Sequence, residues 1–542
     1  MVEMAHLPTT GDADPTTHVS RDQVYAPWPC PLCDGDDWAY LFVSVSGPIH
    51  RCTTCGLTRL HPRPTRSDDV TPSAKGPRDD PFTSDIHAAG PSYEEEAAVA
   101  YSQMLGKDGA SRSSILLIAP RGHPFAGILG RQSRAPETTL DVRELNRSPL
   151  VAARYDYAVV LFELEKAMNP IAVLEQIHAA LKPDGLLLLV TRSLDSWPAR
   201  VFRNEWPGWR QENLYYFDSQ TIQSALLRSG FARIRVRRDQ RRYSLQHVYE
   251  RTRAIPNIWL ARVIRAIYPM VPRPLRRSDR LRLPTSAIVI TARRVERRKQ
   301  PLLSIIMPVY NERPTFEQTM NAVLAKEVSG VDKEIIVVES NSTDGTRQSA
   351  IEYQDCPGVK LVLEDRPRGK GSAVRAGLEH ATGDFILIQD GDQEYDVDDY
   401  DSLIEPLRTY HRAFVLGSRH LAVDWKVRKF TDQPAIAMLF NIGHLLFATA
   451  LNLMYGQRIR DPFTMYKVFR RDCLHGLKFE CNRFDFDFEL VIKLVRKGYV
   501  PLEIPVNYWS RSLKQGKKVS VIKDPITWLW ALIRFRFSRL CS

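Results

Sequence analysis

The feature that most constrains the fold of this chain is a repeated alternation of apolar, strand-length runs with segments of helical periodicity. It occurs twice, over residues 113–294 and again over residues 301–542. Strands that alternate with helices along a chain are typical of parallel α/β sheets. At 542 residues the chain is also too long for a single hydrophobic core. We therefore predict a multidomain α/β protein.

In residues 301–542 each apolar run ends in a cluster of polar side chains. The runs are LLSIIMPVYNE, EIIVVESNSTDGT, VKLVLEDRPRGKG and DFILIQDGDQEYD, which begin at residues 302, 334, 359 and 384. Ligands of open α/β sheets bind at the carboxyl ends of the strands, where such clusters meet. In the last run Asp390 and Asp392 flank Gly391, so both carboxylates can reach one edge of the sheet. The acidic run is therefore either a solvated loop or a site for a divalent cation and a nucleotide diphosphate.

Five motifs in this half, PVYNE, STDGT, RGKG, DGD and GSR, occur in an order that resembles family-2 glycosyltransferases of the GT-A fold. A lone DGD would be a weak signal, whereas five ordered motifs are specific. The segments DPFTMYKVFRRD, RFDFDFEL and EIPVNYWSRSLKQGKKVSVIKDP resemble, more narrowly, the polyprenyl-phosphate (dolichol-phosphate) mannosyltransferase group. The resemblance covers about residues 301–540 and implies a GT-A domain over residues 301–542.

The resemblance also implies a set of site residues. A divalent cation, Mg²⁺ or Mn²⁺, is expected on Asp390, Asp392 and Glu394. Contacts with a nucleotide sugar are implied for Pro308, Tyr310, Glu312, Glu339, Lys370, Gln389, Gly391, Arg419, Arg511 and Lys517. Glu339 stands where the family usually has Asp, which leaves the identity of the base open.

The implied reaction is an inverting single displacement, with Asp390, Asp392 and Asp461 as the catalytic residues. The departing nucleoside diphosphate gains negative charge, which the cation offsets. Asp461 has two interpretations. It is the candidate base if the acceptor is a hydroxyl group, which must lose a proton. It positions other groups, or is structural, if the acceptor is polyprenyl phosphate, which arrives already anionic.

Four cysteines, Cys30, Cys33, Cys52 and Cys55, form the pattern C-x2-C-x18-C-x2-C. Two such pairs present four thiolates in the tetrahedral arrangement that zinc prefers. Four thiolates leave no open coordination position, so we expect a structural Zn²⁺ and not a catalytic one. The prediction is a zinc ribbon over residues 25–61. A linker with a docking helix is expected over residues 62–112.

Residues 113–294 resemble class I S-adenosylmethionine-dependent methyltransferases of the subgroup with an N-terminal zinc ribbon. The likeness rests on YDYAVVLFELEKAMNPIAVLEQIHAALKPDGLLLLV and SLDSWPARVFRNEWPGWRQENLYYFDSQTI. The sequence IAPRGHPFAG replaces the family's glycine-rich cofactor turn, and Glu165-Lys166 replaces its Glu-His. We therefore expect a degenerate, non-catalytic domain. The alternative is an active methyltransferase that binds S-adenosylmethionine.

The formal net charge of +12 favours anionic partners, although a solvated basic face and a basic linker at residues 295–300 would account for much of it. Nucleic acid is not expected. The N-terminal sequence lacks a secretory pattern, so we expect the cytoplasm. Residues 435–455 are either a buried helix or a helix at the membrane interface, and residues 525–537 are either interfacial or packed in the core. Peripheral association with the inner face of a membrane is expected.

Together these patterns predict a metal-dependent, inverting glycosyltransferase. It would move a sugar from a nucleotide sugar to a polyprenyl phosphate or a related glycan or lipid acceptor. One alternative is a bifunctional glycosyltransferase and methyltransferase of polysaccharide or glycolipid assembly. A second alternative is a non-catalytic scaffold. The sugar, the base and the acceptor stay open at this point.

Overall fold

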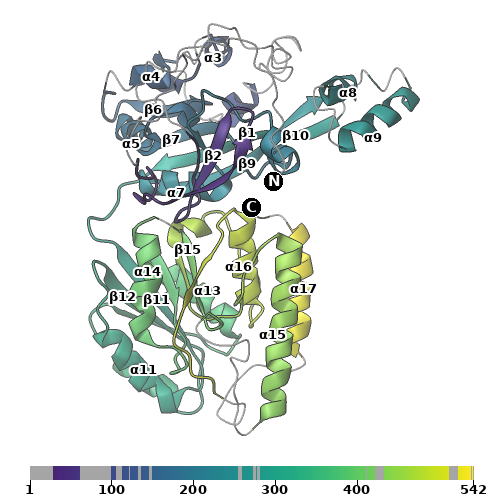
Figure 1. Cartoon of the computed structure of the whole chain (residues 1–542). Helices are drawn as coiled ribbons and strands as arrows, with labels where there is room; N and C mark the ends of the chain where they lie inside the picture. Colours follow the sequence, from purple (N-terminus) through teal and green to yellow (C-terminus); the bar gives the residue numbers. More distant parts are fainter. Residues whose placement is uncertain are drawn as a thin grey trace, which may run out of the picture.

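The computed structural model describes residues 28–61, 99–104, 113–120, 122–131, 136–145, 149–243, 245–253, 259–272, 276, 281–410, 412–421, 433–511, 523–538 and 540. Two α/β halves are stacked on each other, and a small antiparallel sheet lies against the N-terminal half (Figure 1). The predicted α/β class is confirmed in both halves.

The C-terminal half is built on a seven-stranded mixed sheet. Its order is β13 (Val359–Leu363), β12 (Asp332–Glu339), β11 (Leu302–Val309), β14 (Phe385–Ile388), β16 (Lys467–Arg470), β15 (Phe414–Ser418) and β17 (Leu502–Pro505). The first four strands are parallel, and β16 is antiparallel to both of its neighbours. All four residues of β14 are buried, as expected for a strand covered on both faces.

Helices follow the strands of this sheet as the sequence pattern predicts. They are α11 (Arg313–Ala325), α12 (Thr346–Glu352), α13 (Lys370–His380), α14 (Tyr400–Arg408) and α16 (Phe486–Arg496). The turn before α13 needs a glycine, because Gly369 has a φ of +104° and an added Cβ would lie 2.6 Å from the carbonyl oxygen of Asn482. The RGKG motif therefore lets the loop around residue 482 approach the start of α13.

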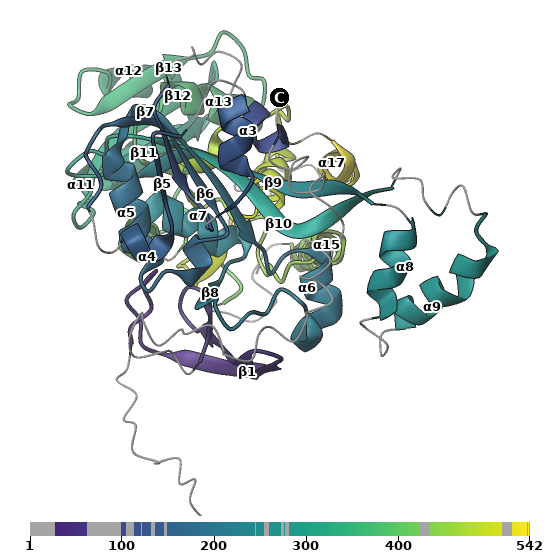
Figure 2. The same ribbon diagram turned by 90° about the horizontal axis from the view of Figure 1, so that it is seen from above.

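The N-terminal half contains a six-stranded sheet. Its order is β5 (Thr138–Leu140), β4 (Ile115–Ile118), β6 (Tyr155–Leu161), β7 (Leu181–Arg192), β10 (Leu281–Arg294) and β9 (Phe231–Tyr243). The first four strands are parallel and β10 is antiparallel to β7 and β9. Its helices include α3 (Phe125–Arg131), α4 (Val142–Leu145), α5 (Pro170–Ala180), α6 (Trp197–Phe202) and α7 (Ser219–Arg228). The long strands β9 and β10 extend beyond the sheet and carry α8 (Leu245–Arg253) and α9 (Trp259–Ile267), which project from the body (Figure 2).

The four-cysteine segment forms a small sheet of β1 (Trp38–Ser44), β2 (Gly47–Cys52) and β3 (Thr58–Leu60). Strand β3 pairs with β8 (Tyr215–Tyr216), which comes from the methyltransferase-like segment. The ribbon is thus continued by a strand outside residues 25–61. In the expected linker, residues 99–104 are helical, and the buried Tyr101 packs in the apolar cluster of β4 and α3.

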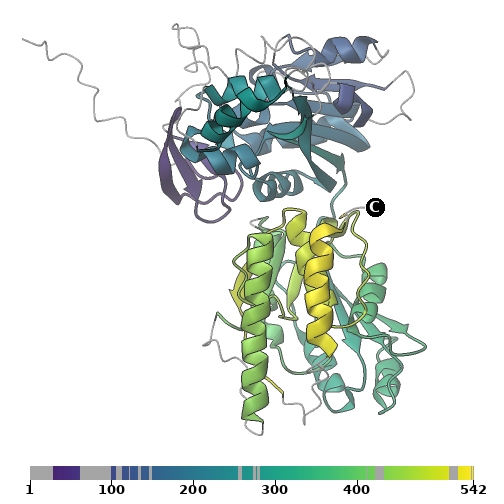
Figure 3. The same ribbon diagram turned by 90° about the vertical axis from the view of Figure 1, so that its right-hand side faces the viewer.

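Two helices, α15 (Pro434–Tyr455) and α17 (Lys523–Phe537), lie side by side on the surface of the C-terminal half (Figure 3). The hydroxyl of Tyr455 donates to the carbonyl of Leu532 at 2.7 Å. Within the described residues α15 is the one helix long and apolar enough to cross a membrane. Only 28% of the most apolar 18-residue stretch of α15 is buried. The interpretation of residues 435–455 as a buried helix is therefore wrong.

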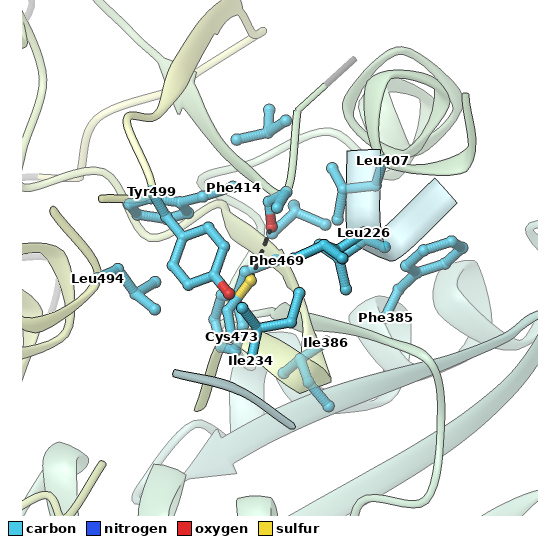
Figure 4. Packing of buried hydrophobic residues seen from close by; sticks show 14 of the residues in the cluster. Leu226, Ile234, Phe385, Ile386, Leu407, Phe414, Phe469, Cys473, Leu494 and Tyr499 are labelled. Carbon is cyan, nitrogen blue, oxygen red and sulfur yellow. Dashed lines mark hydrogen bonds between the residues drawn. The ribbon is translucent and has the colours of Figure 1, made fainter. Parts of the chain in front are cut away.

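The two halves share a buried apolar interface (Figure 4). Leu226 and Ile234 of the N-terminal half lie against Cys473, Phe385 and neighbouring residues of the C-terminal half. Phe385 is the first residue of β14. The amino end of this strand therefore faces the N-terminal half, and its carboxyl end, with the acidic cluster, points away from it.

Candidate functional site

The acidic cluster lies in a cavity of about 750 Å³ at the carboxyl ends of β11, β12 and β14. Asp390, Asp392 and Glu394 all line it, and the last two are only 6% and 8% exposed. Burial, and then the charges of Asp390 and Glu394, raise the pKa of Asp392 to about 7. Carboxylates that repel one another in this way, and that offer oxygen ligands, fit a hard divalent cation.

The guanidinium of Arg511 lies among these acids. It pairs with Asp392, with Glu312 at 3.0 Å and with Glu394 at 3.5 Å. The backbone N–H of Arg511 and the hydroxyl of Tyr508 donate to the two carboxylate oxygens of Glu394 at 3.0 and 2.8 Å. The segment that carries Arg511 is therefore bound to the acidic cluster by both its backbone and its side chain.

The first two motifs of the series are joined directly to each other. The hydroxyl of Thr346 accepts from the N–H of Glu312 at 2.9 Å, and Asp344 accepts from the N–H of Arg313 at 3.1 Å. These bonds satisfy donors at the start of α11. The STDGT loop thus holds the turn of PVYNE, so that Pro308, Tyr310 and Glu312 line the cavity.

Lys370 and Gly391 also line the cavity, and the ammonium group of Lys370 pairs with Asp390. A Cβ added to Gly391 would lie 3.2 Å from a methyl group of Val309, so glycine allows the acidic loop to lie close against β11. Of the predicted site residues, the cavity therefore brings together four acids and three cations: Glu312, Asp390, Asp392, Glu394, Lys370, Arg419 and Arg511.

Two predicted nucleotide contacts do not face the cavity. Glu339 is fully buried and accepts from the N–H groups of Ser342 at 2.6 Å and Asn341 at 3.2 Å, which belong to its own loop. Gln389 is also fully buried, and it donates to the carbonyl of Asp390 at 2.9 Å. Both side chains support the loops around the cavity. Lys517 lies outside the described residues.

Asp461 is fully buried behind the cavity and forms a two-pronged ion pair with Arg419. The guanidinium Nε and Nη2 donate to its two oxygens at 2.8 and 2.7 Å, and the backbone N–H of Arg419 donates at 3.0 Å. Burial alone would raise the pKa of Asp461, but Arg419 holds it well below its ordinary value. A carboxylate held this way is a weak base, which favours the positioning role over the catalytic-base role.

The sequence did not indicate the other half of this cavity. Its lining there is apolar and aromatic, and it comes from α15, α17 and the loop before β16: Leu439, Phe440, Phe447, Phe463 and Trp528. Phe463 and Phe447 meet the ring of Trp528 edge to face, with centroids 4.8 and 5.6 Å apart. The apolar segments that contain these residues were visible, but their convergence on the acidic site was not.

The four cysteines Cys30, Cys33, Cys52 and Cys55 are buried and converge. Sulfur atoms of Cys30 and Cys55 are 3.5 Å apart, those of Cys33 and Cys52 are 3.4 Å apart, and all four lie within 4.8 Å of one another. Tetrahedral zinc with Zn–S bonds of about 2.3 Å places its sulfurs roughly 3.8 Å apart. The donor set and its spacing fit a structural zinc ion.

In the methyltransferase-like segment, the side chains of Asp141 and Glu165 form hydrogen bonds with groups of the same domain. Asp141 caps α4 by accepting from the N–H groups of Arg143 and Glu144, each at 2.9 Å. Glu165 is buried, and it accepts from the Thr191 hydroxyl at 3.0 Å. Both contacts are structural, and neither points to S-adenosylmethionine.

Two family models match the chain. The one described as "Glycosyl transferase family 2" matches residues 304–477, and the one described as "Methyltransferase domain" matches residues 74–236. The two ranges fall in the C-terminal and N-terminal halves, respectively. They agree with the two resemblances inferred from the motifs.

The chain is similar to a dolichyl-phosphate beta-glucosyltransferase of Trichomonas vaginalis, with 30% identity over 249 residues that cover 43% of this chain and 71% of that protein. It is also similar to a dolichol-phosphate mannosyltransferase of Pyrococcus furiosus, with 26% identity over 215 residues that cover 40% of this chain and 58% of that protein. A mannosyltransferase of Pyrobaculum calidifontis, solved with GDP-Man and Mn²⁺, is 23% identical, with a TM-score of 0.29 and coverage of 38% of this chain and 55% of that chain.

Proposed function

Because the chain belongs to glycosyl transferase family 2, we propose that residues 301–542 transfer a sugar from a nucleotide sugar to a polyprenyl phosphate. The observation that carries this proposal is the two-sided cavity. One side holds acids and cations suited to a metal-bound diphosphate, and the other side is lined by apolar rings from α15 and α17.

On the polar side, Asp390, Asp392 and Glu394 would hold Mn²⁺ or Mg²⁺. When bound, the cation supplies positive charge against the departing diphosphate. Tyr310 offers a ring for stacking on the base, and Glu312 offers a carboxylate to the ribose hydroxyls. Pro308 and Gly391 would also contact the nucleotide sugar. Lys370, Arg419 and Arg511 are among the cations that line this cavity, and they would bind the phosphate groups.

On the apolar side, the rings of Phe447, Phe463 and Trp528 suit the isoprenoid units of a lipid acceptor. A lipid phosphate is already anionic, so its oxygen can attack the anomeric carbon of the sugar without a base. The bond from that carbon to the nucleoside diphosphate breaks in the same step. This agrees with an Asp461 that is held by Arg419. The proposed displacement is a single inverting step with no covalent enzyme intermediate.

The outer face of α15 and α17 suits the surface of a membrane. Its large apolar side chains are 40–82% exposed, and they are Met438, Leu439, Ile442, Leu445, Leu446, Leu453, Ile526, Leu529, Trp530, Ile533 and Phe537. Apolar patches of this extent are typical of interaction surfaces. We propose that the protein works in the cytoplasm and binds peripherally at the inner face of a membrane, with these two helices at the lipid surface.

For the N-terminal half we propose a zinc ribbon at residues 25–61, a linker at 62–112 and a non-catalytic methyltransferase domain at 113–294. The short segment 295–300 joins it to the transferase domain. The buried interface with β14 supports a scaffolding role. The match to a methyltransferase family supports an additional methyltransferase activity as the second candidate. Binding of S-adenosylmethionine to the full chain would distinguish the two.

The test is transfer of label from a panel of radiolabelled nucleotide sugars, with Mn²⁺, into organic-extractable polyprenyl phosphate. Asp392→Asn is the matched control, because it keeps the shape of the side chain and removes its charge. Transfer from one donor that is lost in the variant supports the proposal. Metal-dependent hydrolysis of a donor without a lipid product would redirect the search to hydroxyl acceptors. If the protein shows no turnover and binds no nucleotide, the enzymatic assignment is overturned.

A further inference from the structure

We propose that the α8–α9 hairpin of the methyltransferase-like half is a second membrane contact, which docks on anionic phospholipid headgroups. The proposal rests on the proposed function only in placing the membrane at the face of α15 and α17. The hairpin belongs to the N-terminal half and lies outside the glycosyltransferase domain.

The hairpin is held together by its own contacts. The rings of Tyr249 and Tyr268 stack with centroids 3.9 Å apart and an interplanar angle of 10°. The guanidinium of Arg276 lies 4.9 Å from the Tyr268 ring and donates to the carbonyl of Val271 at 2.7 Å. These contacts define the inner side of the hairpin, at the end of the long β9–β10 ribbon that carries it away from the body (Figure 2).

The outer side of α9 and of the turn after it is apolar. Val263, Ile267 and Met270 recur at helical spacing and are 41%, 54% and 82% exposed. Arg262 is exposed beside them and Arg265 is half-buried. A row of exposed apolar side chains flanked by arginines is typical of helices that lie in the headgroup region of a membrane.

Charge decides between the possible surfaces. Among the charged side chains that the structure describes in this hairpin, three are arginines, Arg262, Arg265 and Arg276, and one is an acid, Glu250. Such an excess attracts anionic headgroups. A nucleic acid would also attract it, but phosphates and bases offer little to an exposed row of aliphatic side chains. The combination of both features favours a lipid surface.

The position of the hairpin agrees with this choice. Seen from the side in Figure 3, the α8–α9 hairpin lies on the same face of the molecule as α15 and α17. In α17, Arg534 and Arg536 are exposed, and Arg534 pairs with Glu480. One membrane surface can therefore contact both halves at once, with the apolar side of the cavity next to it. Two separated contacts would fix the orientation of the transferase domain, which a single pair of helices does not.

The test is co-sedimentation of the full chain with vesicles of phosphatidylcholine alone or mixed with phosphatidylglycerol. We expect binding to the anionic vesicles, and a decrease of at least about tenfold in the affinity of Arg262→Gln/Arg265→Gln. Arg262→Lys/Arg265→Lys should bind like the wild type, because charge is retained. Ile267→Asp/Met270→Asp should weaken binding without abolishing it, because α15 and α17 remain, whereas the matched control Ile351→Asp, on α12 of the other half, should bind like the wild type.

Wild-type binding by all hairpin variants would overturn the proposal, as would tighter binding to RNA or duplex DNA than to anionic vesicles at the same salt concentration. Thermal unfolding of each variant shows whether it is folded. Binding of a nucleotide sugar with Mn²⁺ is measured on the same samples. If the wild type does not bind the nucleotide sugar, that result counts against the proposed transferase function. The vesicle result would still test the proposed membrane contact of the hairpin.

Discussion

The guanidinium of Arg511 donates a hydrogen bond to the carboxylate of Asp392, the second acid of the DGD motif. The same guanidinium pairs with Glu312 and Glu394. A positive side chain from the C-terminal segment thus compensates the acids that we propose as cation ligands. A bound cation and Arg511 would both draw on the charge of Asp392, so their contributions to stability are coupled.

Replacing Arg511 with Gln should therefore increase the stabilisation that Mn²⁺ provides. The variant keeps the acids but loses the charge that offsets their repulsion, so the protein without metal is less stable and gains more from the cation. We expect a larger Mn²⁺-induced increase in Tm than in the wild type, measured by calorimetry. Arg511→Lys is the control and should give a smaller change than Arg511→Gln. Equal shifts in the wild type and Arg511→Gln would show that Arg511 and the cation are independent.

Breaking the buried pair of Arg419 and Asp461 should mainly affect stability. Asp461→Asn leaves the guanidinium without its counter-charge, and removal of one partner from a buried pair costs about 3–5 kcal/mol. Chemical denaturation measures this loss. We expect the pH dependence of the residual transfer to stay the same as in the wild type. A stable variant that loses the dependence of rate on a basic group would instead identify Asp461 as the base.

Glu334 should contribute stability that is lost in acid. Burial would raise its pKa, but hydrogen bonds from Lys360, Ser304 and Thr382 lower it from 4.5 to about 2. Because the folded pKa is lower than the unfolded one, the stabilisation is present above pH 4.5 and disappears as the pH falls towards 2. Glu334→Gln should lower the free energy of unfolding by about 1–3 kcal/mol at pH 7.

The difference between Glu334→Gln and the wild type should narrow as the pH is lowered through this window, as followed by urea unfolding at several pH values. Glu352, exposed on α12, provides a matched control in Glu352→Gln. A difference that does not depend on pH would mean that Glu334 acts through packing and not through its charge.

Cys473 should report on the interface between the two halves. Burial raises the pKa of its thiol to about 12, and the thiol donates to the carbonyl of Ala413 at 3.6 Å. At pH 8 almost none of it is thiolate, so alkylation of the native protein should be slow. Leu226→Ala should loosen the interface and speed the alkylation of Cys473, as measured by peptide mass spectrometry. Cys481, buried within the C-terminal half, should be unaffected. Equal acceleration at both sites would indicate general unfolding.

Removal of zinc should loosen the ribbon and its contact with the transferase half. Arg412 of that half donates to the carbonyl of Cys55 at 3.3 Å, directly beside the four thiols. Cys52→Ser should lose bound zinc in elemental analysis and lower the Tm. Cys356→Ser, which lies away from the cluster, is the control and should retain both. A full zinc content in Cys52→Ser would contradict the four-cysteine site.

Much of the site could be predicted from the sequence, because its polar residues lie within short segments directly after the strands. Apolar runs define where β11, β12 and β14 lie, and the polar residues directly after them must gather at one sheet edge. The direction of a single side chain at such an edge is not local. Glu339 and Gln389 fall in the right motifs, yet each is turned into a loop by hydrogen bonds with neighbouring residues.

The sequence alone determined the two α/β patterns and the four-cysteine cluster, because these depend on periodicity and on spacing within short segments. Its resemblance to a known family implied most of the residues on the polar side of the cavity. Only the tertiary structure decided that α15 and α17 complete the same cavity with apolar rings, since residues 447 and 528 are far apart in the chain and meet only through packing. It also decided that Arg511 lies among the acids and that the α8–α9 hairpin lies on the face of these helices. Contacts between distant segments are selected by the burial of complementary surfaces, which no local pattern encodes.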